Sequence, residues 1–193
     1  MYCIPAGASQ CEFHCHAPVG IFTFIVFTIA YNEMANHNVT AVLYNIRSAH
    51  NVGSMFRTAD AAGINKIYLC GYTPIPETRG KKRGSDKIAK TALGAEKSVS
   101  WEYVPRIGKL LDKLNNDGIQ IIALEQAKGN KNVFKFKPKR ALALIVGNEV
   151  KGLPASILKR ASGVVEIPMH GKKESLNVSV AFGIAAYSLL QKS

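Results

Sequence analysis

Two short runs of almost wholly apolar residues, 119–124 and 141–146, constrain the fold of this chain more than any other feature of its sequence. Both runs are bounded by polar loops, and neither shows the alternation of apolar and polar residues that is typical of a half-exposed strand. Strands of this kind are buried on both faces, as in a parallel sheet that helices cover on each side. The two runs therefore predict a parallel sheet at the centre of the protein.

Strand and helix patterns alternate along the chain around these two runs. Further strands are predicted at residues 39–44, 66–70, 99–104 and 164–167. Helices are predicted at residues 51–62, closed by Gly63, at 106–117, closed by Gly118, at 154–160, with Pro154 in the first turn, and at 177–190. This order favours a single α/β domain, a doubly wound parallel sheet flanked by helices.

The last predicted helix, residues 177–190, is apolar on nearly every face. A terminal helix with so little polar surface needs a second partner besides its own sheet. We therefore predict a homodimer that buries this helix.

The charge of the chain indicates a polyanionic partner. Lysine and arginine number 25 against 13 acidic residues, a net charge of +12. Basic side chains gather in two segments, and the second interleaves them with Phe134 and Phe136. They are Lys81, Lys82, Arg83, Lys87 and Lys90, then Lys135, Lys137, Lys139 and Arg140. A nucleic acid could contact these segments, because cations attract phosphates and rings stack on unpaired bases, and an ordinary solvated basic surface is the alternative. Alternatively, the two rings pack under their loop.

The N-terminal segment differs in composition from the rest, since residues 1–33 contain no lysine or arginine. Its apolar run, 19–31, is shorter than the roughly twenty residues of a membrane-spanning helix. No second Cys/His pair follows the cluster at residues 11–16, so no zinc site is predicted. The four cysteines do not indicate a disulfide scaffold, and we expect a cytoplasmic protein. We interpret residues 1–36 as an N-terminal extension, either disordered or a start-site artefact, and residues 37–193 as the functional domain.

A strand end that faces a helix start indicates a ligand site. The strand at residues 164–167 stops at Pro168, a polar loop follows, and the last helix is expected to begin near Ser175. Ligands of α/β proteins bind at the carboxyl ends of strands, where loops expose backbone amides and helix N-termini. Ser175 and Asn177 are therefore candidate site residues. Alternatively, they only cap the helix.

Two other stretches can carry chemistry. Residues 45–63 contain Asn51, which is expected to begin a helix, and Arg57, whose guanidinium matches phosphate geometry. Arg57 could instead form an ion pair with Asp60. Residues 147–153 read G-N-E-V-K-G-L directly after a buried strand, where Gly147 would let a ligand approach the backbone. An ordinary glycine-rich turn is the alternative.

The three stretches, in this order, resemble the motifs of one enzyme family. N-x-x-x-x-x-R in the first helix, then G-N-E-x-x-G-L, then I-P-M-x-G-x-x-E-S-L-N-V-S-V-A resemble the three motifs of the SpoU/TrmH family of RNA 2'-O-ribose methyltransferases, within the SPOUT superfamily. The resemblance covers about residues 38–190. It implies an α/β fold with a deep C-terminal trefoil knot, a homodimer, and S-adenosylmethionine as methyl donor without a metal. The substrate would be tRNA or rRNA.

The resemblance also implies roles for individual residues. The catalytic and ribose-handling positions correspond to Asn51, Arg57, Glu149, Ser175 and Asn177. Residues whose backbone holds the methyl donor correspond to Gly147, Ile167 and Leu176, and the walls of its site to Leu124, Glu125 and Met169. Because a guanidinium has a pKa above about 12, Arg57 is expected to clamp phosphate and stabilise the forming alkoxide rather than act as a base.

Two other classes of protein compete with this interpretation. A non-catalytic RNA-binding module with the same fold would explain the charge, but it need not combine Asn51, Arg57, Glu149 and Asn177. A dinucleotide-dependent oxidoreductase would need G-x-G-x-x-G after the first strand, and residues 45–53 supply no such string.

Overall fold

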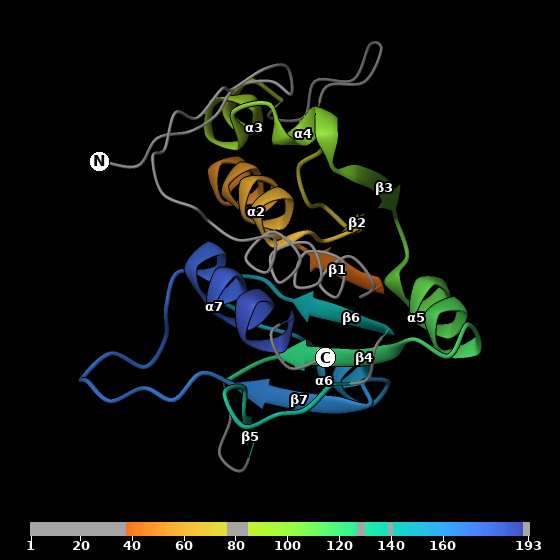
Figure 1. Cartoon of the computed structure of the whole chain (residues 1–193), viewed down its shortest axis with the longest axis vertical. Coiled ribbons are helices and arrows are strands. Elements are labelled where there is room, and N and C mark those ends of the chain that lie inside the picture. The colour runs from red at the N-terminus through yellow and green to blue at the C-terminus, as the bar shows by residue number, and fades with distance from the viewer. Residues whose placement is uncertain (1–37, 77–84, 127–129, 139–140, 191–193) are drawn as a thin grey trace, which may run out of the picture. The chain divides into compact units, whose positions relative to one another are not determined.

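The chain divides into two units, Met1–Glu33 and Met34–Ser193. The computed structural model describes residues 38–76, 85–126, 130–138 and 141–190, all in the second unit. They form a seven-stranded sheet in the order β3-β2-β1-β6-β4-β7-β5 (Figure 1). All neighbouring strands of this sheet are parallel. The prediction of a parallel sheet is therefore confirmed.

The strands are β1 (Asn38–Tyr44), β2 (Lys66–Cys70), β3 (Ser100–Val104), β4 (Gln120–Leu124), β5 (Lys131–Asn132), β6 (Ala141–Val146) and β7 (Gly163–Glu166). The helices are α2 (Ala49–Ala62), α3 (Ser85–Ala92), α4 (Ala95–Ser98), α5 (Ile107–Asn116), α6 (Ala155–Leu158) and α7 (Val178–Leu190).

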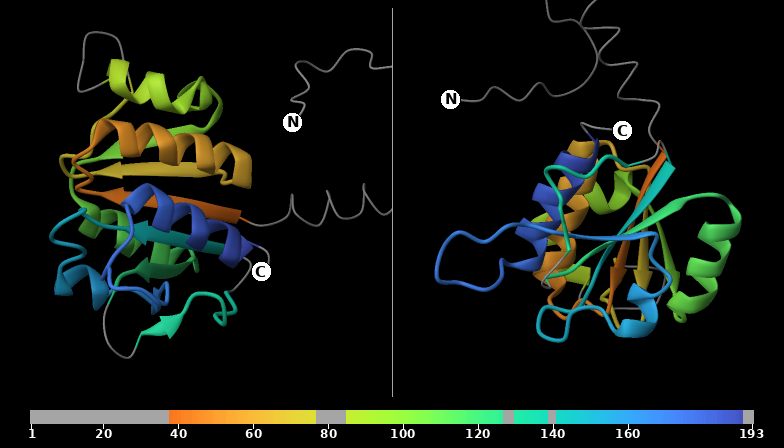
Figure 2. Two further views of the ribbon diagram at one scale, coloured as in Figure 1. Left: turned by 90° about the vertical axis from the view of Figure 1, so that its left-hand side faces the viewer. Right: turned by 90° about the horizontal axis from the view of Figure 1, so that it is seen from below.

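Helices cover both faces of the sheet. On one face α2, α3, α4 and α7 pack against alternate strand residues such as Ala41 and Leu43. On the other face α5 and α6 pack against residues such as Val42. The two layers are visible in the right-hand view of Figure 2. Residues 142–146 of β6 are buried throughout, as the apolar run predicted.

The boundaries of α2 follow from its capping residues. The Ser48 hydroxyl caps its N-terminus by accepting a hydrogen bond from the backbone N–H of Asn51. Gly63, in the left-handed conformation with φ of 72°, ends the helix and donates to the carbonyls of Ala59 and Asp60. The expectation that Asn51 begins this helix is therefore wrong, because Ser48 is the capping residue.

α2 also packs closely against α3. A Cβ atom at Gly53 would collide with the side chain of Thr91 and the carbonyl oxygen of Ile88. The Thr91 hydroxyl in turn lies 3.0 Å from the carbonyl oxygen of His50. α2 and α3 can therefore approach this closely only because residue 53 has no side chain.

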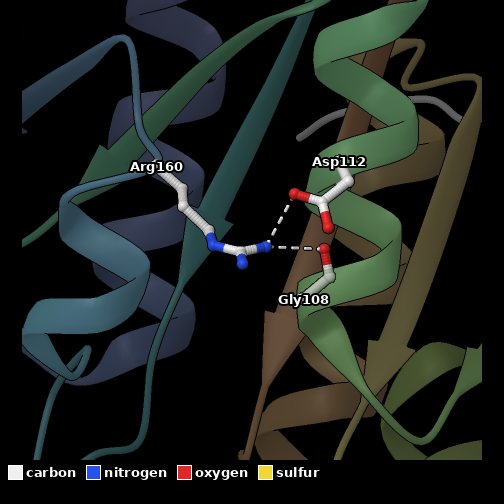
Figure 3. Close-up of polar contacts among 3 residues, drawn as sticks. All are labelled: Gly108, Asp112 and Arg160. Carbon is white, nitrogen blue, oxygen red and sulfur yellow. Dashed lines mark hydrogen bonds and ion pairs between the residues drawn. The ribbon is translucent and has the colours of Figure 1, made fainter.

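On the opposite face, one arginine links α5 to the segment that follows α6. Arg160 donates from Nη1 to the carbonyl of Gly108 at 2.9 Å and to the carboxylate of Asp112 at 2.8 Å (Figure 3). The Arg160 and Asp112 side chains remain 43% and 63% exposed. The contact joins two surface elements rather than filling the core.

Some expectations about secondary structure are wrong. The last helix begins at Val178 rather than near Ser175, which lies in the preceding loop. Pro154 precedes α6 instead of lying within its first turn. The sequence analysis also missed α3, α4 and β5. α3 is short and rich in charge, and its described apolar contact with the core comes mainly from Ile88 and Ala92, so its pattern is weak.

Several expectations fall outside the described residues. These are the N-terminal extension 1–36, the cluster at 11–16, and the basic residues Lys81, Lys82, Arg83, Lys139 and Arg140. The two phenylalanines of the second basic segment differ: Phe136 is 9% exposed and joins the core, whereas Phe134 is 49% exposed. The packing interpretation therefore holds for Phe136 alone. Within the described part of the chain, no helix is long and apolar enough to cross a membrane.

Candidate functional site

A cavity of about 220 Å³ lies at the carboxyl ends of β4, β6 and β7. Its walls come from the loops after these strands and from the start of α7. The cavity is lined by Leu124, Glu125, Gln126, Val146, Gly147, Asn148, Glu149, Val150, Gly152, Ile167, Met169, Ser175, Leu176, Val178 and Ala181. All six residues predicted to hold the methyl donor are among them, as are Glu149 and Ser175.

Two glycines shape the loop that follows β6. A Cβ atom at Gly147 would lie 2.7 Å from the carbonyl carbon of Gly152, so the chain can fold back on itself only without a side chain there. Gly152 has φ of 62°, and a Cβ atom there would collide with the carboxylate of Glu125. The loop therefore presents its backbone directly to the cavity.

The Glu125 side chain fastens this loop to the end of β4. Its carboxylate accepts hydrogen bonds from the backbone N–H of Leu153 at 2.6 Å and of Gln126 at 3.0 Å. Glu125 was predicted as a wall of the methyl-donor site, and it does line the cavity. Because both carboxylate oxygens already bind backbone donors, its main effect is to fix the loop.

Beside the cavity, Glu149 gathers donors from the loop after β1. Its carboxylate accepts from the backbone N–H groups of Arg47 at 2.9 Å and Ser48 at 3.1 Å. It also accepts from the Asn51 side-chain amide at 3.1 Å. Glu149 therefore joins the β6 loop to the first turn of α2, although the two segments are about a hundred residues apart in the sequence.

The hydrogen-bonded chain continues from Asn51 to the start of α7. The Asn177 amide donates to Asn51 Oδ1 at 3.3 Å. Asn177 Oδ1 accepts from the backbone N–H of Ser179 at 2.9 Å and from its hydroxyl at 2.7 Å. Asn177 thus caps α7, as the alternative interpretation proposed, and also contacts Asn51. Residues from all three motif stretches meet in this cluster.

The environment of Glu149 keeps it ionised. Partial burial raises the pKa of its carboxyl, but the backbone donors, including Arg47 and Ser48, and the Asn51 amide outweigh this effect. The pKa therefore lies below its ordinary value. A carboxylate held this way is a weak base, so the geometry favours an anchoring role for Glu149.

Arg57 is not brought to the cavity within this chain. It is exposed and lies six residues beyond Asn51, which is about 9 Å along the axis of α2. The predicted alternative, an ion pair with Asp60, does not form: among described residues Arg57 has no bonded partner, and the Asp60 carboxylate accepts from the Ser98 hydroxyl instead. The guanidinium is thus available to a ligand or a second chain.

Sequence reasoning missed the residue between Gly147 and Glu149. The amide of Asn148, which is 7% exposed, donates to the carbonyl of Asn45 at 2.9 Å and to the Tyr72 hydroxyl at 2.8 Å. Its Oδ1 accepts from the backbone N–H groups of Val150 and Lys151. The available signal was its place inside the G-N-E motif, where asparagine commonly organises a turn.

The chemistry of the described site has two parts. The cavity combines apolar walls with exposed backbone groups, which suits a small nucleoside-like molecule. The amides of the half-buried Asn51 and the exposed Asn177 are not among the residues that line it and can bind a second polar substrate. Among described residues, no group of three or more His, Cys, Asp or Glu could hold a metal ion. The described cysteine, Cys70, is buried, and burial raises its pKa to about 12, which excludes it as a nucleophile.

Residues 38–187 match the model of the SpoU rRNA Methylase family. A tRNA (guanosine(18)-2'-O)-methyltransferase from Aquifex aeolicus (strain VF5) is 34% identical over 147 residues, 74% of this chain. The chain spans 64% of the length of that relative.

Solved structures show the same fold. The A. aeolicus TrmH/SpoU tRNA modifying enzyme matches with a TM-score of 0.70 and 28% identity, covering 86% of this chain and 84% of that one. An AdoMet-bound rRNA methyltransferase from Sinorhizobium meliloti matches with a TM-score of 0.67 and 25% identity, covering 78% of this chain and 55% of that one.

Proposed function

The chain belongs to the SpoU rRNA methylase family, and we propose that it transfers a methyl group from S-adenosylmethionine to a ribose 2'-hydroxyl of tRNA or rRNA. The observation that carries the proposal is the hydrogen-bonded chain from Glu149 through Asn51 to Asn177, which borders the cavity. We propose residues 37–193 as the methyltransferase domain. A cytoplasmic location stays a prediction.

The cavity is the proposed site of the methyl donor. Gly147, Ile167 and Leu176 line it, and their backbone amide and carbonyl groups would bind the adenine and ribose. The S. meliloti relative with bound AdoMet supports this assignment. At about 220 Å³ the cavity is smaller than the 300–1,000 Å³ or so that is typical of ligand pockets. Leu176 in its wall is 38% exposed, so RNA or a second subunit would complete the enclosure.

In the proposed reaction the ribose 2'-oxygen attacks the methyl carbon of the sulfonium. The carbon–sulfur bond breaks, S-adenosylhomocysteine leaves, and the hydroxyl proton passes to phosphate or water. Most of the rate enhancement would come from holding the two substrates in line. Asn51 and Asn177 would orient the ribose, Ser175 would contact it from the cavity wall, and Glu149 would fix Asn51. Arg57 would clamp a phosphate and stabilise the forming alkoxide.

We propose that a homodimer completes the site. Val180 is 50% exposed and Tyr187 44% exposed, and with the half-buried Ile184 between them they form an apolar stripe along α7. A second copy packed on this stripe would cover it. The Arg57 of each copy could then reach the cavity of the other. A deep trefoil knot around the cavity belongs to the same proposal, which the TM-score of 0.70 to the A. aeolicus enzyme supports.

The test is incubation of the full chain with S-adenosylmethionine labelled in the methyl group and total RNA, followed by nucleoside analysis. We expect label in 2'-O-methyl nucleosides, and a strong decrease for Asn177→Ala. Lys113→Ala, on the far face of the sheet, is the matched control and should behave like wild type. Label on bases would assign a different reaction. RNA binding without any transfer would instead favour the non-catalytic RNA-binding module.

The oligomeric state has its own test, which is light scattering at micromolar concentration. A dimer is expected, and Val180→Asp on the stripe should dissociate it. A stable monomer of the wild-type chain would contradict the proposed dimer while leaving the chemistry of the cavity open.

A further inference from the structure

Tyr72 is an exposed aromatic residue whose hydroxyl contacts Asn148, the residue next to Glu149 of the cluster. Tyr72 follows β2 at the carboxyl edge of the sheet, and 46% of its surface is exposed. Of the large aromatic side chains that are exposed in the described residues, it is the one bonded to a residue lining the cavity, because its hydroxyl contacts Asn148. A ring that served only the core would be covered.

The backbone that carries Tyr72 is held firmly. Gly71, with φ of 67°, makes the turn, and the Tyr72 N–H donates to Asn45 Oδ1 at 3.1 Å. The next residue, Thr73, is fully buried, and its hydroxyl accepts from the Ile46 N–H at 3.1 Å. The Tyr103 hydroxyl donates to the Gly71 carbonyl at 2.8 Å. The exposed ring therefore stands on a rigid base.

The tip of the side chain is fixed as well. The Asn148 amide donates to the Tyr72 oxygen at 2.8 Å and to the Asn45 carbonyl at 2.9 Å, which uses both of its hydrogens. The phenolic proton itself has no acceptor among the described residues. Tyr72 thus presents a ring of set orientation and one free hydrogen-bond donor.

Two exposed cations lie on the segments that hold this ring. Arg47 belongs to the loop that follows β1, the same segment as Asn45. Lys151 lies in the β6 loop, where its backbone N–H donates to Asn148 Oδ1. Both side chains are exposed. An exposed ring among cations is the usual surface for unpaired nucleotides, whose phosphates seek the charge and whose bases stack.

We infer that Tyr72 is a stacking platform for a base of the RNA, either that of the target nucleotide or that of its neighbour. The inference rests on the proposed function. If the ribose binds at the cluster of Glu149, Asn51 and Asn177, the base attached to it must lie on the adjoining surface of the protein. A base splayed from its helix loses its stacking partners, and an aromatic ring replaces them. Unpaired RNA at the methylation site is the substrate class that this arrangement fits.

The experiment compares Tyr72→Ala, Tyr72→Leu and Tyr72→Phe with wild type in the full chain. Loss of the ring in Tyr72→Ala and Tyr72→Leu should raise the KM for total RNA by about 5- to 150-fold, the range of base–aromatic stacking. Tyr72→Phe keeps the ring and should stay within about threefold of wild type. Affinity for S-adenosylmethionine, measured by calorimetry, should be unchanged in all three.

Each outcome decides the inference. An unchanged KM for Tyr72→Ala overturns it, and so does a parallel loss of S-adenosylmethionine affinity, because Tyr72 would then act on the cavity through Asn148. If the wild-type chain transfers no methyl group to RNA, the proposed function fails separately. Binding of a fluorescent single-stranded RNA oligonucleotide then gives the answer, and equal affinity of wild type and Tyr72→Ala overturns the platform.

Discussion

α2 and α5 cover opposite faces of the same sheet, and they use their surfaces differently. α5 buries one stripe, formed by Ile107, Leu110, Leu111 and Leu114, and exposes most of the rest. α2 packs on the sheet, on α3 at Gly53 and on α7, where a Cβ atom at Gly183 would touch Thr58. Its first turn also binds Glu149. α2, which positions site residues, thus packs against several elements, whereas α5, which covers the sheet, buries a single stripe.

The largest expected effect comes from the exposed arginine of α2. Replacing Arg57 by alanine should lower methyl transfer by about 100-fold or more, because the charge that we propose to stabilise the forming alkoxide is lost. Arg57→Lys should retain a substantial share, since the charge remains and a guanidinium is a poor base. Single-turnover assays with labelled S-adenosylmethionine measure both. Arg106→Ala, an exposed arginine beside α5, is the control. Equal losses of methyl transfer in Arg57→Ala and Arg106→Ala would contradict the proposed difference between the α2 side and the α5 side.

The next effect concerns the contact that ties α2 to the β6 loop. Glu149→Gln should lower activity by about 10- to 100-fold, since the two backbone N–H groups of Arg47 and Ser48 would face an amide with only one acceptor. Folding should respond to pH in a defined direction. The pKa of Glu149 is lowered in the fold from its ordinary 4.5, so its stabilising effect is complete above that value and is lost as pH falls further.

Thermal unfolding of the two proteins checks this sign. The Tm difference between wild type and Glu149→Gln should be largest near pH 7 and should shrink below about pH 4.5. Other carboxyl groups titrate equally in both proteins and cancel. A difference that grew towards acid pH would mean that Glu149 is not held as an anion.

A third comparison uses the glycines of the two helices. Gly53→Ala should destabilise the fold by about 1–3 kcal/mol, because the added Cβ would collide with Thr91 and with the α3 backbone. In α5, a Cβ at Gly108 would meet only the end of the Arg160 side chain at 3.4 Å, and this side chain can move. Gly108→Ala should therefore be neutral or stabilise by up to about 1 kcal/mol. Denaturant unfolding measures both, and equal losses would contradict the close packing of α2.

The same contrast explains what the sequence could predict. The apolar stripe of α5 and the continuous apolar runs of β4 and β6 are patterns local to each segment, so their positions were predicted closely. Asn177 was a candidate from its place at a helix start, but only the resemblance to a family joined Asn51, Glu149 and Asn177 into one site, because no local pattern links positions so far apart. No role was predicted for Asn148 or Tyr72, because their importance lies in a contact between two loops that are far apart in the sequence.

Two further differences have physical causes of the same kind. α3 was missed because eight residues with few apolar side chains form a helix mainly through packing on α2. Ser175 was expected at the start of α7, but the helix begins at Val178, where Asn177 supplies the cap. A cap-forming residue type shows where a helix can begin, and the surrounding contacts decide which candidate is used.

The smallest expected effect is on the α5 side. Arg160→Ala removes the contacts with Asp112 and the Gly108 carbonyl (Figure 3), but both charged side chains are exposed to solvent. Exposed ion pairs contribute about 0–1 kcal/mol, so stability should fall by no more than that and methyl transfer should not change. Denaturant unfolding in low and high salt measures the effect, which should weaken as salt screens the pair. A loss of activity in Arg160→Ala would mean that the α5 face of the sheet affects the site. The claim that only the α2 face positions site residues would then be wrong.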